Sequence, residues 1–234
     1  MRANEDFRAE HVRDWVVYLD DGLAVIDKPS GLLSQPGPSG EPDLVSLARA
    51  HFGDLKLGVL HRLDRNVSGL VLLSRTPEVA RWLSPQFAAG TIERDYLAIC
   101  RGKPEQEKLT IEVPLLKDER ANLVRVADLE EPGAQAARTE VEVLARAQGL
   151  TGKLVLVRAR PISGRSHQLR VHLAHAGLPI LGDPKYGLRA RGLERPLLHA
   201  TALRYLDARS GEHVSHRREP PFRMDQAVLL QRAR

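Results

Sequence analysis

Apolar and polar positions alternate in short blocks along this chain, and most of the blocks are typical of β-strands. Two apolar runs, at residues 15–19 and 23–26, flank the polar sequence Asp20-Asp21-Gly22. An Asp-Gly step between two such runs predicts a tight turn and therefore a β-hairpin. Further apolar blocks predict strands at residues 70–73, 94–100, 109–116, 122–127, 137–145 and 153–159.

Other segments carry the signals of helices. Residues 43–53 predict a helix that is capped by Asp43 and ended by Gly53. The sequence Thr-Pro-Glu at residues 76–78 is typical of a helix start. Pro85 should kink or divide the helix that begins there, because proline cannot donate an intrahelical hydrogen bond.

Strands outnumber helices and are mostly joined by short turns. This order predicts an α+β fold, with an antiparallel-rich mixed sheet and flanking helices, and argues against a doubly wound fold. The chain of 234 residues shows no internal repeat and no convincing linker. We therefore expect one domain over residues 1–234.

The charge of the chain favours a polyanionic partner. The formal net charge is +5 and the sequence pI is about 9.6. Most of the basic residues are arginine, which suits bidentate phosphate contacts. Aromatic residues make up 4% of the chain, which argues against a module that binds single strands through rows of stacked rings.

The single cysteine bears on disulfides and zinc sites, and the N-terminal residues bear on the cellular location. Cys100 lies in an apolar run, so we expect a buried strand residue there and no internal disulfide or multi-cysteine zinc site. Residues 1–6 contain no apolar segment typical of a signal peptide. No apolar run approaches the length of a membrane span. These features predict a cytoplasmic protein.

The segment with the clearest chemistry covers residues 61–73. It places Asp64 between Arg62 and Arg65, directly before the apolar run of a predicted buried strand. The two arginines favour the ionised carboxylate and offer guanidinium groups for phosphate. This combination suits an acid that stays charged at neutral pH and meets an RNA or nucleotide substrate. A lone Asp in such a loop is more often a cap or a salt-bridged residue, and the loop alone leaves that alternative open.

A second polar block covers residues 160–173. A strand should end at Arg160, and Ser166 is placed to cap a helix that begins at His167. Arg165 should therefore lie beside a helix N-terminus, which attracts anions. From the residues alone, Arg165 could serve a carboxylate or a phosphate equally well.

The Asp64 segment resembles the active-site signature of the RluA-type pseudouridine synthases, with Val67 where that family usually has Thr. Five further segments resemble motifs of the same family in the expected order, so the resemblance extends over nearly the full chain. These segments are residues 20–32, 94–102, 164–172, 181–187 and 198–200.

The resemblance implies an isomerase that converts a specific uridine of RNA to pseudouridine by flipping the base out of its stack, with no metal and no cofactor. Its partner would be a stem-loop of tRNA or of large-subunit rRNA, with no DNA and no membrane. The resemblance also implies a monomer and a single catalytic domain, with the active-site cleft between two halves. The subgroup that it suggests has no separate RNA-binding domain in front.

The resemblance also implies roles for individual residues. Asp64 would act at the ribose, as a nucleophile at carbon 1′ or as a base at carbon 2′. Tyr96 would lie against the uracil ring and assist proton removal at carbon 5. Arg165 would pair with Asp64, and Leu198 would form part of an apolar pocket around the base. Arg62 would fill the gap that the flipped uridine leaves.

Plainer roles stay open for several of these residues. Without the motif, Tyr96 would be a core strand residue, and Leu198 is more often plain core than pocket. His61 and Arg170 are further candidates for substrate binding. The residue pattern alone favours a structural or phosphate-adjacent role for both His61 and His199.

Two other functions compete with this interpretation. His167, His172 and His175 suggest a metal hydrolase, but their spacing does not match the paired i, i+4 ligands of a zinc helix. The second alternative is a catalytically inactive RNA-binding or RNA-folding protein on the same fold. The presence of Asp64, Tyr96 and Arg165 argues against that loss of activity.

Overall fold

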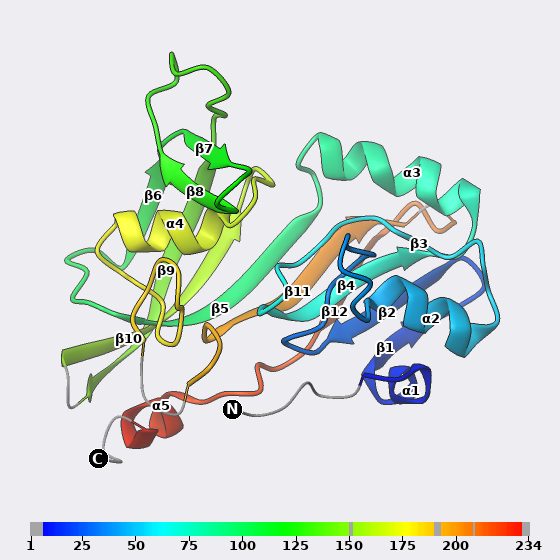
Figure 1. Cartoon of the computed structure of the whole chain (residues 1–234), viewed down its shortest axis with the longest axis horizontal. Helices are drawn as coiled ribbons and strands as arrows, with labels where there is room; N and C mark the ends of the chain where they lie inside the picture. Colours follow the sequence, from blue (N-terminus) through cyan, green and yellow to red (C-terminus); the bar gives the residue numbers. More distant parts are fainter. Residues whose placement is uncertain (1–6, 150–151, 190–192, 208, 231–234) are drawn as a thin grey trace. The chain divides into compact units, whose positions relative to one another are not determined.

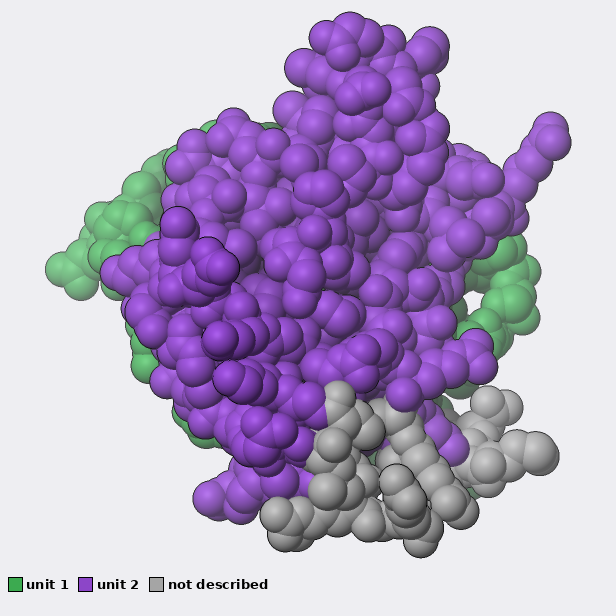
Figure 2. All heavy atoms as spheres, turned by 90° about the vertical axis from the view of Figure 1, so that its left-hand side faces the viewer, with its two compact units in different colours: residues 1–93, 200–219 green, residues 94–199, 220–234 purple. Residues whose placement is uncertain are grey.

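The computed structural model describes residues 7–149, 152–189, 193–207 and 209–230. The chain forms two compact units, which Figure 2 shows in different colours. Unit 1 consists of residues 1–93 and 200–219, and unit 2 of residues 94–199 and 220–234. The single domain and the cleft between two halves that the sequence suggested stay predictions.

Unit 1 is a mostly antiparallel sheet with helices packed on it (Figure 1). Its order is β1-β2-β4-β11, with β3 paired to β4 and β12 to β11. The strands are β1 (Val16–Leu19), β2 (Leu23–Lys28), β3 (Gly58–Val59), β4 (Ser68–Ser74), most of β11 (Leu198–Leu206) and β12 (His213–Arg217). The helices are the 3-10 turn η1 (Ala9–His11), α1 (Val12–Trp15), α2 (Leu44–Phe52) and α3 (Pro77–Ala88).

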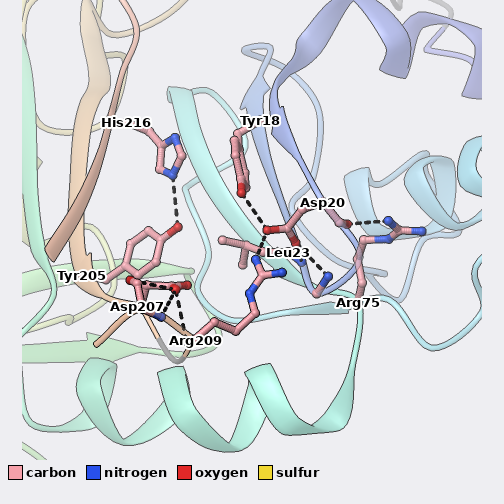
Figure 3. Close-up of polar contacts among 10 residues, drawn as sticks. Tyr18, Asp20, Leu23, Arg75, Tyr205, Asp207, Arg209 and His216 are labelled. Carbon is pink, nitrogen blue, oxygen red and sulfur yellow. Dashed lines mark hydrogen bonds and ion pairs between the residues drawn. The ribbon is translucent and has the colours of Figure 1, made fainter. Parts of the chain in front are cut away.

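The predicted hairpin is confirmed as β1 and β2, and Asp20 forms its turn. The Oδ1 atom of Asp20 accepts hydrogen bonds from Gly22 N at 2.7 Å and from Leu23 N at 2.8 Å. Figure 3 shows that Tyr18 and Arg209 also bind this carboxylate. Burial alone would raise the pKa of Asp20, but the hydrogen bonds from Tyr18 and from Gly22 N lower it. The carboxylate therefore stays ionised and holds the turn closed.

The predicted caps of two helices are also confirmed. Asp43 Oδ1 accepts a hydrogen bond from Ser46 N at 2.9 Å, and α2 ends at Gly53. Thr76 caps α3 in the same way. Pro85 does not divide this helix, because α3 continues to Ala88, and a kink at Pro85 stays a prediction. A proline near the end of a helix removes only one intrahelical hydrogen bond, and the packing of the helix offsets that loss.

The core of unit 1 explains why β2 and β4 are apolar almost throughout. Every residue of β4 is buried, so both faces of this strand must be covered. On one face, Leu83 of α3 joins an apolar cluster with residues of the sheet. The buried members of that cluster are Leu23, Val25, Leu70, Leu72, Leu83, Ile92, Leu203 and Tyr205.

Unit 2 contains the antiparallel order β5-β10-β9-β6 and a separate two-stranded sheet of β7 and β8. The strands are β5 (Glu93–Arg101), β6 (Lys108–Glu112), β7 (Leu115–Asp118), β8 (Leu123–Val126), β9 (Arg138–Gly149) and β10 (Gly152–Pro161). The helices are α4 (Gln168–His175) and α5 (Met224–Leu230).

One predicted strand of unit 2 is wrong, and the α+β class is confirmed. The block at residues 109–116 is two strands, β6 and β7, which belong to different sheets. Pro114 lies between them, and a proline cannot donate a ladder hydrogen bond. Residues 150–151, between the strands predicted at 137–145 and 153–159, lie outside the described residues. Cys100 is buried in β5 as predicted, and burial raises the pKa of its thiol.

The helices of unit 2 cover two apolar clusters. Ala227 of α5 packs in a cluster that includes Ile99 and Leu154 of the sheet. Val171 of α4 packs with Leu115 and Val124, so α4 holds the β7–β8 pair in place. Within the described part of the chain, no helix is long and apolar enough to cross a membrane.

His172 joins α4 to the segment that precedes β7. Its ring is fully buried, with Nδ1 2.9 Å from Thr139 Oγ1 and Nε2 3.2 Å from Val113 O. Burial lowers the pKa of His172, because the charged imidazolium loses its hydration. The folded chain therefore keeps this ring neutral.

Gly69 allows β4 and β11 to approach each other. Its φ is +120°, and a Cβ there would lie 2.4 Å from Ala200 O and 2.5 Å from Ala200 N. Only glycine fits such an approach. Two of the segments that resemble family motifs, at residues 61–73 and 198–200, therefore meet at this point.

We predict that Gly69→Ala lowers the free energy of unfolding by on the order of 3 kcal/mol, because the strand backbone must move apart. Gly40→Ala is the control, since Gly40 has a φ of +69° but no atom within 4 Å of an added Cβ. It should cost only about 1 kcal/mol for the left-handed backbone. Urea unfolding measures both, and equal losses would show that the close approach to Ala200 is unimportant.

We also predict that the free energy of unfolding falls as the pH drops below about 6.5. The unfolded chain takes up a proton on His172 near that pH, whereas the folded chain resists it. The contribution of His172 to the free energy of unfolding is therefore fully present above about pH 6.5. It is lost as the pH falls toward the lowered pKa that His172 has in the folded chain.

Urea unfolding at several pH values should show a shallower pH dependence for His172→Gln than for the wild type. His213→Gln is the control, because solvent reaches the ring of His213 in the folded chain. An unchanged slope in His172→Gln would contradict this role of the buried ring.

Candidate active site

Asp64 lies in unit 1, on the loop of residues 61–67 that leads into β4. Its side chain is half-buried, and the flanking Arg62 and Arg65 are exposed. The N–H of Val67 donates to Asp64 O at 3.0 Å, which closes a tight turn directly before the strand. Arg65 forms an ion pair with Glu41 at 2.6 Å. The carboxylate is therefore placed by a turn whose end is fixed by a fully buried strand.

Lys28 holds this loop in place through hydrogen bonds from its buried side chain. Its side chain is completely buried, and Nζ donates to three backbone carbonyl oxygens. These oxygens belong to Leu32 at 2.7 Å, Pro29 at 2.9 Å and Arg65 at 3.1 Å. A buried ammonium group needs such partners, because its desolvation is otherwise very unfavourable. The carbonyl beside Asp64 is therefore held by a charged group.

The segment after Lys28 adds further bonds to the same loop. Gly31 N donates to Arg65 O at 2.8 Å, and Ser30 Oγ donates to Asn66 O at 2.8 Å. Ser34 binds both backbone groups of Leu63, accepting from N at 3.0 Å and donating to O at 2.9 Å. In the sequence, residues 28–31 stand out only as part of the segment 20–32 that resembles a family motif. Lys28 stands between Asp27 and Pro29, so its neighbours in the sequence give no local signal that its side chain is buried.

Two other residues of the loop have roles inside unit 1. His61 Nε2 accepts a hydrogen bond from Leu72 N at 3.0 Å, and its ring stacks on Phe87 of α3 at 4.7 Å. These contacts fix the start of the loop, and substrate binding by His61 stays a prediction. Val67 is buried, with 2% of its surface exposed, so its apolar side chain suits the position.

Tyr96 and Leu198 lie in unit 2, Tyr96 on β5 and Leu198 at the start of β11, most of which belongs to unit 1. Tyr96 is in β5, opposite Ala159 of β10, and only 7% of its surface is exposed. The residue before it, Asp95, accepts two hydrogen bonds from Arg160, at 2.8 and 3.2 Å. Leu198 is the first residue of β11 and is 2% exposed. Both predicted site residues are thus held on strands, and their contacts with a base stay predictions.

Arg165 lies on the loop between β10 and α4, and its side chain is exposed. Its Nε donates to Ala136 O at 3.1 Å, which holds the guanidinium group on one side. The predicted cap at Ser166 is wrong. The helix begins one residue later, at Gln168, and His167 is the cap residue with a φ of +53°. Histidine is among the residues that tolerate this left-handed conformation.

Gln168 organises this loop, which the sequence did not predict. Its Oε1 accepts hydrogen bonds from Arg165 N at 3.0 Å and from Ser163 Oγ at 2.8 Å. Its Nε2 donates to Arg138 O at 2.9 Å and to Thr139 Oγ1 at 3.0 Å. The buried side-chain amide of Gln168 accepts hydrogen bonds through its oxygen and donates them through its nitrogen. It therefore connects the Arg165 loop to β9.

Arg170 points away from solvent in this structure. It is 5% exposed and forms a bidentate pair with Asp183, through Nε at 2.8 Å and Nη2 at 2.7 Å. Burial alone would raise the pKa of Asp183, but the hydrogen bonds from Arg170 lower it. The guanidinium group is thus committed to Asp183, and substrate binding by Arg170 stays a prediction.

The structure groups the predicted site residues in two sets. His61, Arg62 and Asp64 share one loop of unit 1. Tyr96, Arg165, Arg170 and Leu198 come from four segments of unit 2. The pairing of Arg165 with Asp64 stays a prediction. In the part of the chain that the structure describes, no group of three His, Cys, Asp or Glu residues is arranged to hold a metal ion.

Comparison with known proteins identifies relatives along most of the chain. Residues 22–175 match a family model described as RNA pseudouridylate synthase. The chain is 35% identical over 207 residues to ribosomal large subunit pseudouridine synthase C of Yersinia pestis, covering 85% of this chain and 63% of that protein. It is 40% identical over 194 residues to an uncharacterized RNA pseudouridine synthase of Zymomonas mobilis, covering 80% of this chain and 85% of that one. The chain thus spans less than two thirds of the Yersinia relative.

Solved structures show the same fold. Human RNA pseudouridylate synthase domain containing 1 has a TM-score of 0.74 and 24% identity, covering 94% of each chain. Human RNA pseudouridylate synthase domain containing 4 has a TM-score of 0.75 and 24% identity, covering 96% of this chain and 95% of that one. At this identity the likeness concerns the fold. The family model and the Zymomonas relative go further, and they show that the chain belongs to the RNA pseudouridylate synthase family, as its sequence segments predicted.

Proposed function

We propose that this protein converts a uridine of structured RNA to pseudouridine, and that Asp64 is the catalytic carboxylate. The observation that carries this proposal is the position of Asp64. It is half-buried on a turn before β4, and Lys28 holds the carbonyl of the next residue. A carboxylate on such a rigid turn is well placed for chemistry that requires accurate positioning. Membership of the family supports the reaction type.

The proposed reaction breaks the bond between uracil nitrogen 1 and carbon 1′ of the ribose. The uracil then turns, and its carbon 5 is joined to carbon 1′ while carbon 5 releases its proton and nitrogen 1 takes up a proton, so that the product is an isomer of uridine. Asp64 acts at the ribose, either as a nucleophile at carbon 1′ or as a base at carbon 2′. Either role requires the ionised carboxylate.

Four further residues complete the proposal. Tyr96 lies against the uracil and assists removal of the proton from carbon 5. Arg165 supplies the counter-charge of Asp64, and Leu198 contributes to the apolar surroundings of the base. Arg62, which is exposed beside Asp64, occupies the space that the flipped uridine leaves in the RNA stack. No step of the reaction requires a metal or a cofactor.

The proposed substrate is a stem-loop of large-subunit ribosomal RNA, with a tRNA stem-loop as the alternative. Several curated relatives are named ribosomal large subunit pseudouridine synthase C. The net charge of +5 suits an RNA partner. We further propose that the protein acts as a monomer.

We predict that Asp64→Asn abolishes turnover while leaving RNA affinity within about twofold, because Asn keeps the shape but loses the reactive carboxylate. Release of tritium from RNA that carries 5-tritiated uridine measures the reaction. Asp21→Asn, at an exposed position in the β1–β2 turn, is the control and should keep wild-type turnover. Asp64→Asn activity within about tenfold of wild type would remove Asp64 from the mechanism. Absence of tritium release by the wild type, despite RNA binding, would favour the inactive RNA-binding alternative.

A separate prediction concerns Arg62. Flipping a stacked uridine costs a few kcal/mol, and a residue that fills the gap recovers part of that cost. Arg62→Ala should therefore reduce turnover much more on a rigid stem-loop than on a flexible RNA whose uridine is already unstacked.

Arg81→Ala is the control, because Arg81 is an exposed arginine of α3 outside the Asp64 loop. It should affect both RNAs equally or not at all. Equal losses of turnover for Arg62→Ala on the two RNAs would assign Arg62 to general binding or to chemistry instead of base flipping.

A further inference from the structure

Tyr186 lies in the segment of residues 181–187, to which the proposed reaction assigns no role. Its hydroxyl group is 2.7 Å from Nδ1 of His167 and accepts a hydrogen bond from Val124 N at 2.8 Å. His167 caps α4 and follows Arg165 by two residues. One hydroxyl group therefore joins the Arg165 loop to the backbone of β8.

Asp183 holds Tyr186 in place from the other side. Its Oδ1 accepts hydrogen bonds from Lys185 N at 2.9 Å and from Tyr186 N at 3.3 Å. The same carboxylate forms the buried pair with Arg170 of α4, whose guanidinium carbon lies 5.0 Å from the centre of the Tyr186 ring. A hydrogen bond to Asp183 thus fixes the backbone of Tyr186, and a cation–π contact with Arg170 holds the face of its ring.

The turn that presents Tyr186 is unusually tight. A Cβ on Gly187 would lie 2.1 Å from Ile180 O and 2.8 Å from the Cβ of Asp183. Glycine is therefore required directly after Tyr186. The segment is built so that the ring reaches across to α4, and the polar end of the ring arrives at His167.

His167 needs such support, because its backbone adopts a conformation that side-chain-bearing residues seldom adopt. Its φ is +53°, and its side chain makes no capping hydrogen bond to the helix. Gln168 fixes the backbone N–H of Arg165, and Ala136 fixes its Nε. The contact with Tyr186 adds a fixed point at His167 itself.

We propose that Tyr186 is a positioning residue for Arg165: its hydroxyl group donates to Nδ1 of His167 and holds residues 165–167 in the conformation that presents the guanidinium group. A hydroxyl group has one hydrogen, and the bond from Val124 N uses only its acceptor capacity. We assign the hydrogen to Nδ1 of His167, which makes His167 the tautomer protonated at Nε2. This inference rests on the proposed function, in which Arg165 is the counter-charge of Asp64.

The test compares Tyr186→Phe with a matched control, Tyr205→Phe. Tyr205 in unit 1 is a buried tyrosine whose hydroxyl group, like that of the half-buried Tyr186, binds a histidine, here His216 Nε2 at 3.0 Å (Figure 3). We expect Tyr186→Phe to lower kcat by about tenfold with the RNA Kd within about twofold. Hydrogen exchange of the Arg165 amide, followed by NMR, should become about tenfold faster. Tyr205→Phe should change neither kcat nor the exchange rate of the Arg165 amide.

A second pair of variants separates the hydrogen bond from the loss of a ring. His167→Asn keeps a residue that tolerates positive φ and offers an acceptor oxygen near the position of Nδ1. It should retain kcat within about threefold of wild type. His167→Leu should lose at least as much kcat as Tyr186→Phe, because Leu also fits the positive φ poorly. The double variant Tyr186→Phe/His167→Leu should be no less active than His167→Leu alone, because the two changes remove the same hydrogen bond.

Each result decides the inference. Wild-type kcat in Tyr186→Phe would overturn it, whether or not the Arg165 amide exchanges faster. Equal losses of kcat in Tyr186→Phe and Tyr205→Phe would also overturn it, because the effect would then be general destabilisation. If the wild type proves inactive on RNA, the proposed function fails. Hydrogen exchange of the Arg165 amide in Tyr186→Phe then still decides whether Tyr186 holds residues 165–167 in place. An unchanged exchange rate in this variant would overturn the positioning role of Tyr186.

Discussion

Lys28 places an ammonium group in the interior of unit 1, where the carbonyl oxygens of Pro29, Leu32 and Arg65 accept its hydrogen bonds. A hydrogen bond to a charged group contributes about 1.5–3 kcal/mol, and a buried charge that loses its partners is far more costly. The three carbonyl groups therefore cannot separate without exposing or stranding the charge. Because one of them belongs to the neighbour of Asp64, the carboxylate is positioned by a residue outside its own loop.

Unit 2 uses the same physical principle around a different charge. Arg170 and Asp183 form a buried pair, which would be unfavourable without good geometry and additional hydrogen bonds. Asp183 receives those bonds from two backbone N–H groups, one of which belongs to Tyr186. In both units, a buried ion fixes a backbone segment: the loop beside Asp64 in unit 1, and the segment that carries Tyr186 in unit 2.

The sequence predicts the parts of the fold that depend on neighbouring residues. The Asp20 turn and the Asp43 cap could be predicted because each involves only residues within three positions of the carboxylate. The roles of Lys28 and Gln168 could not, since each also binds a backbone carbonyl group about thirty or more residues away, that of Arg65 or Arg138 respectively. The helix start predicted at Ser166 failed for a related reason. Long-range bonds hold the preceding loop, so the helix needs no local side-chain cap. The candidate site residues came from the resemblance, because spacing alone left plainer roles open.

The central claim is that this protein forms pseudouridine in cellular RNA through the carboxylate of Asp64. Mapping pseudouridine in the RNA of cells with and without this gene tests it most directly. We expect at least one pseudouridine to disappear without the gene, to return when the wild-type gene is restored and to remain absent when the restored copy carries Asp64→Asn. An unchanged pseudouridine map, or full restoration by the Asp64→Asn copy, would contradict this claim.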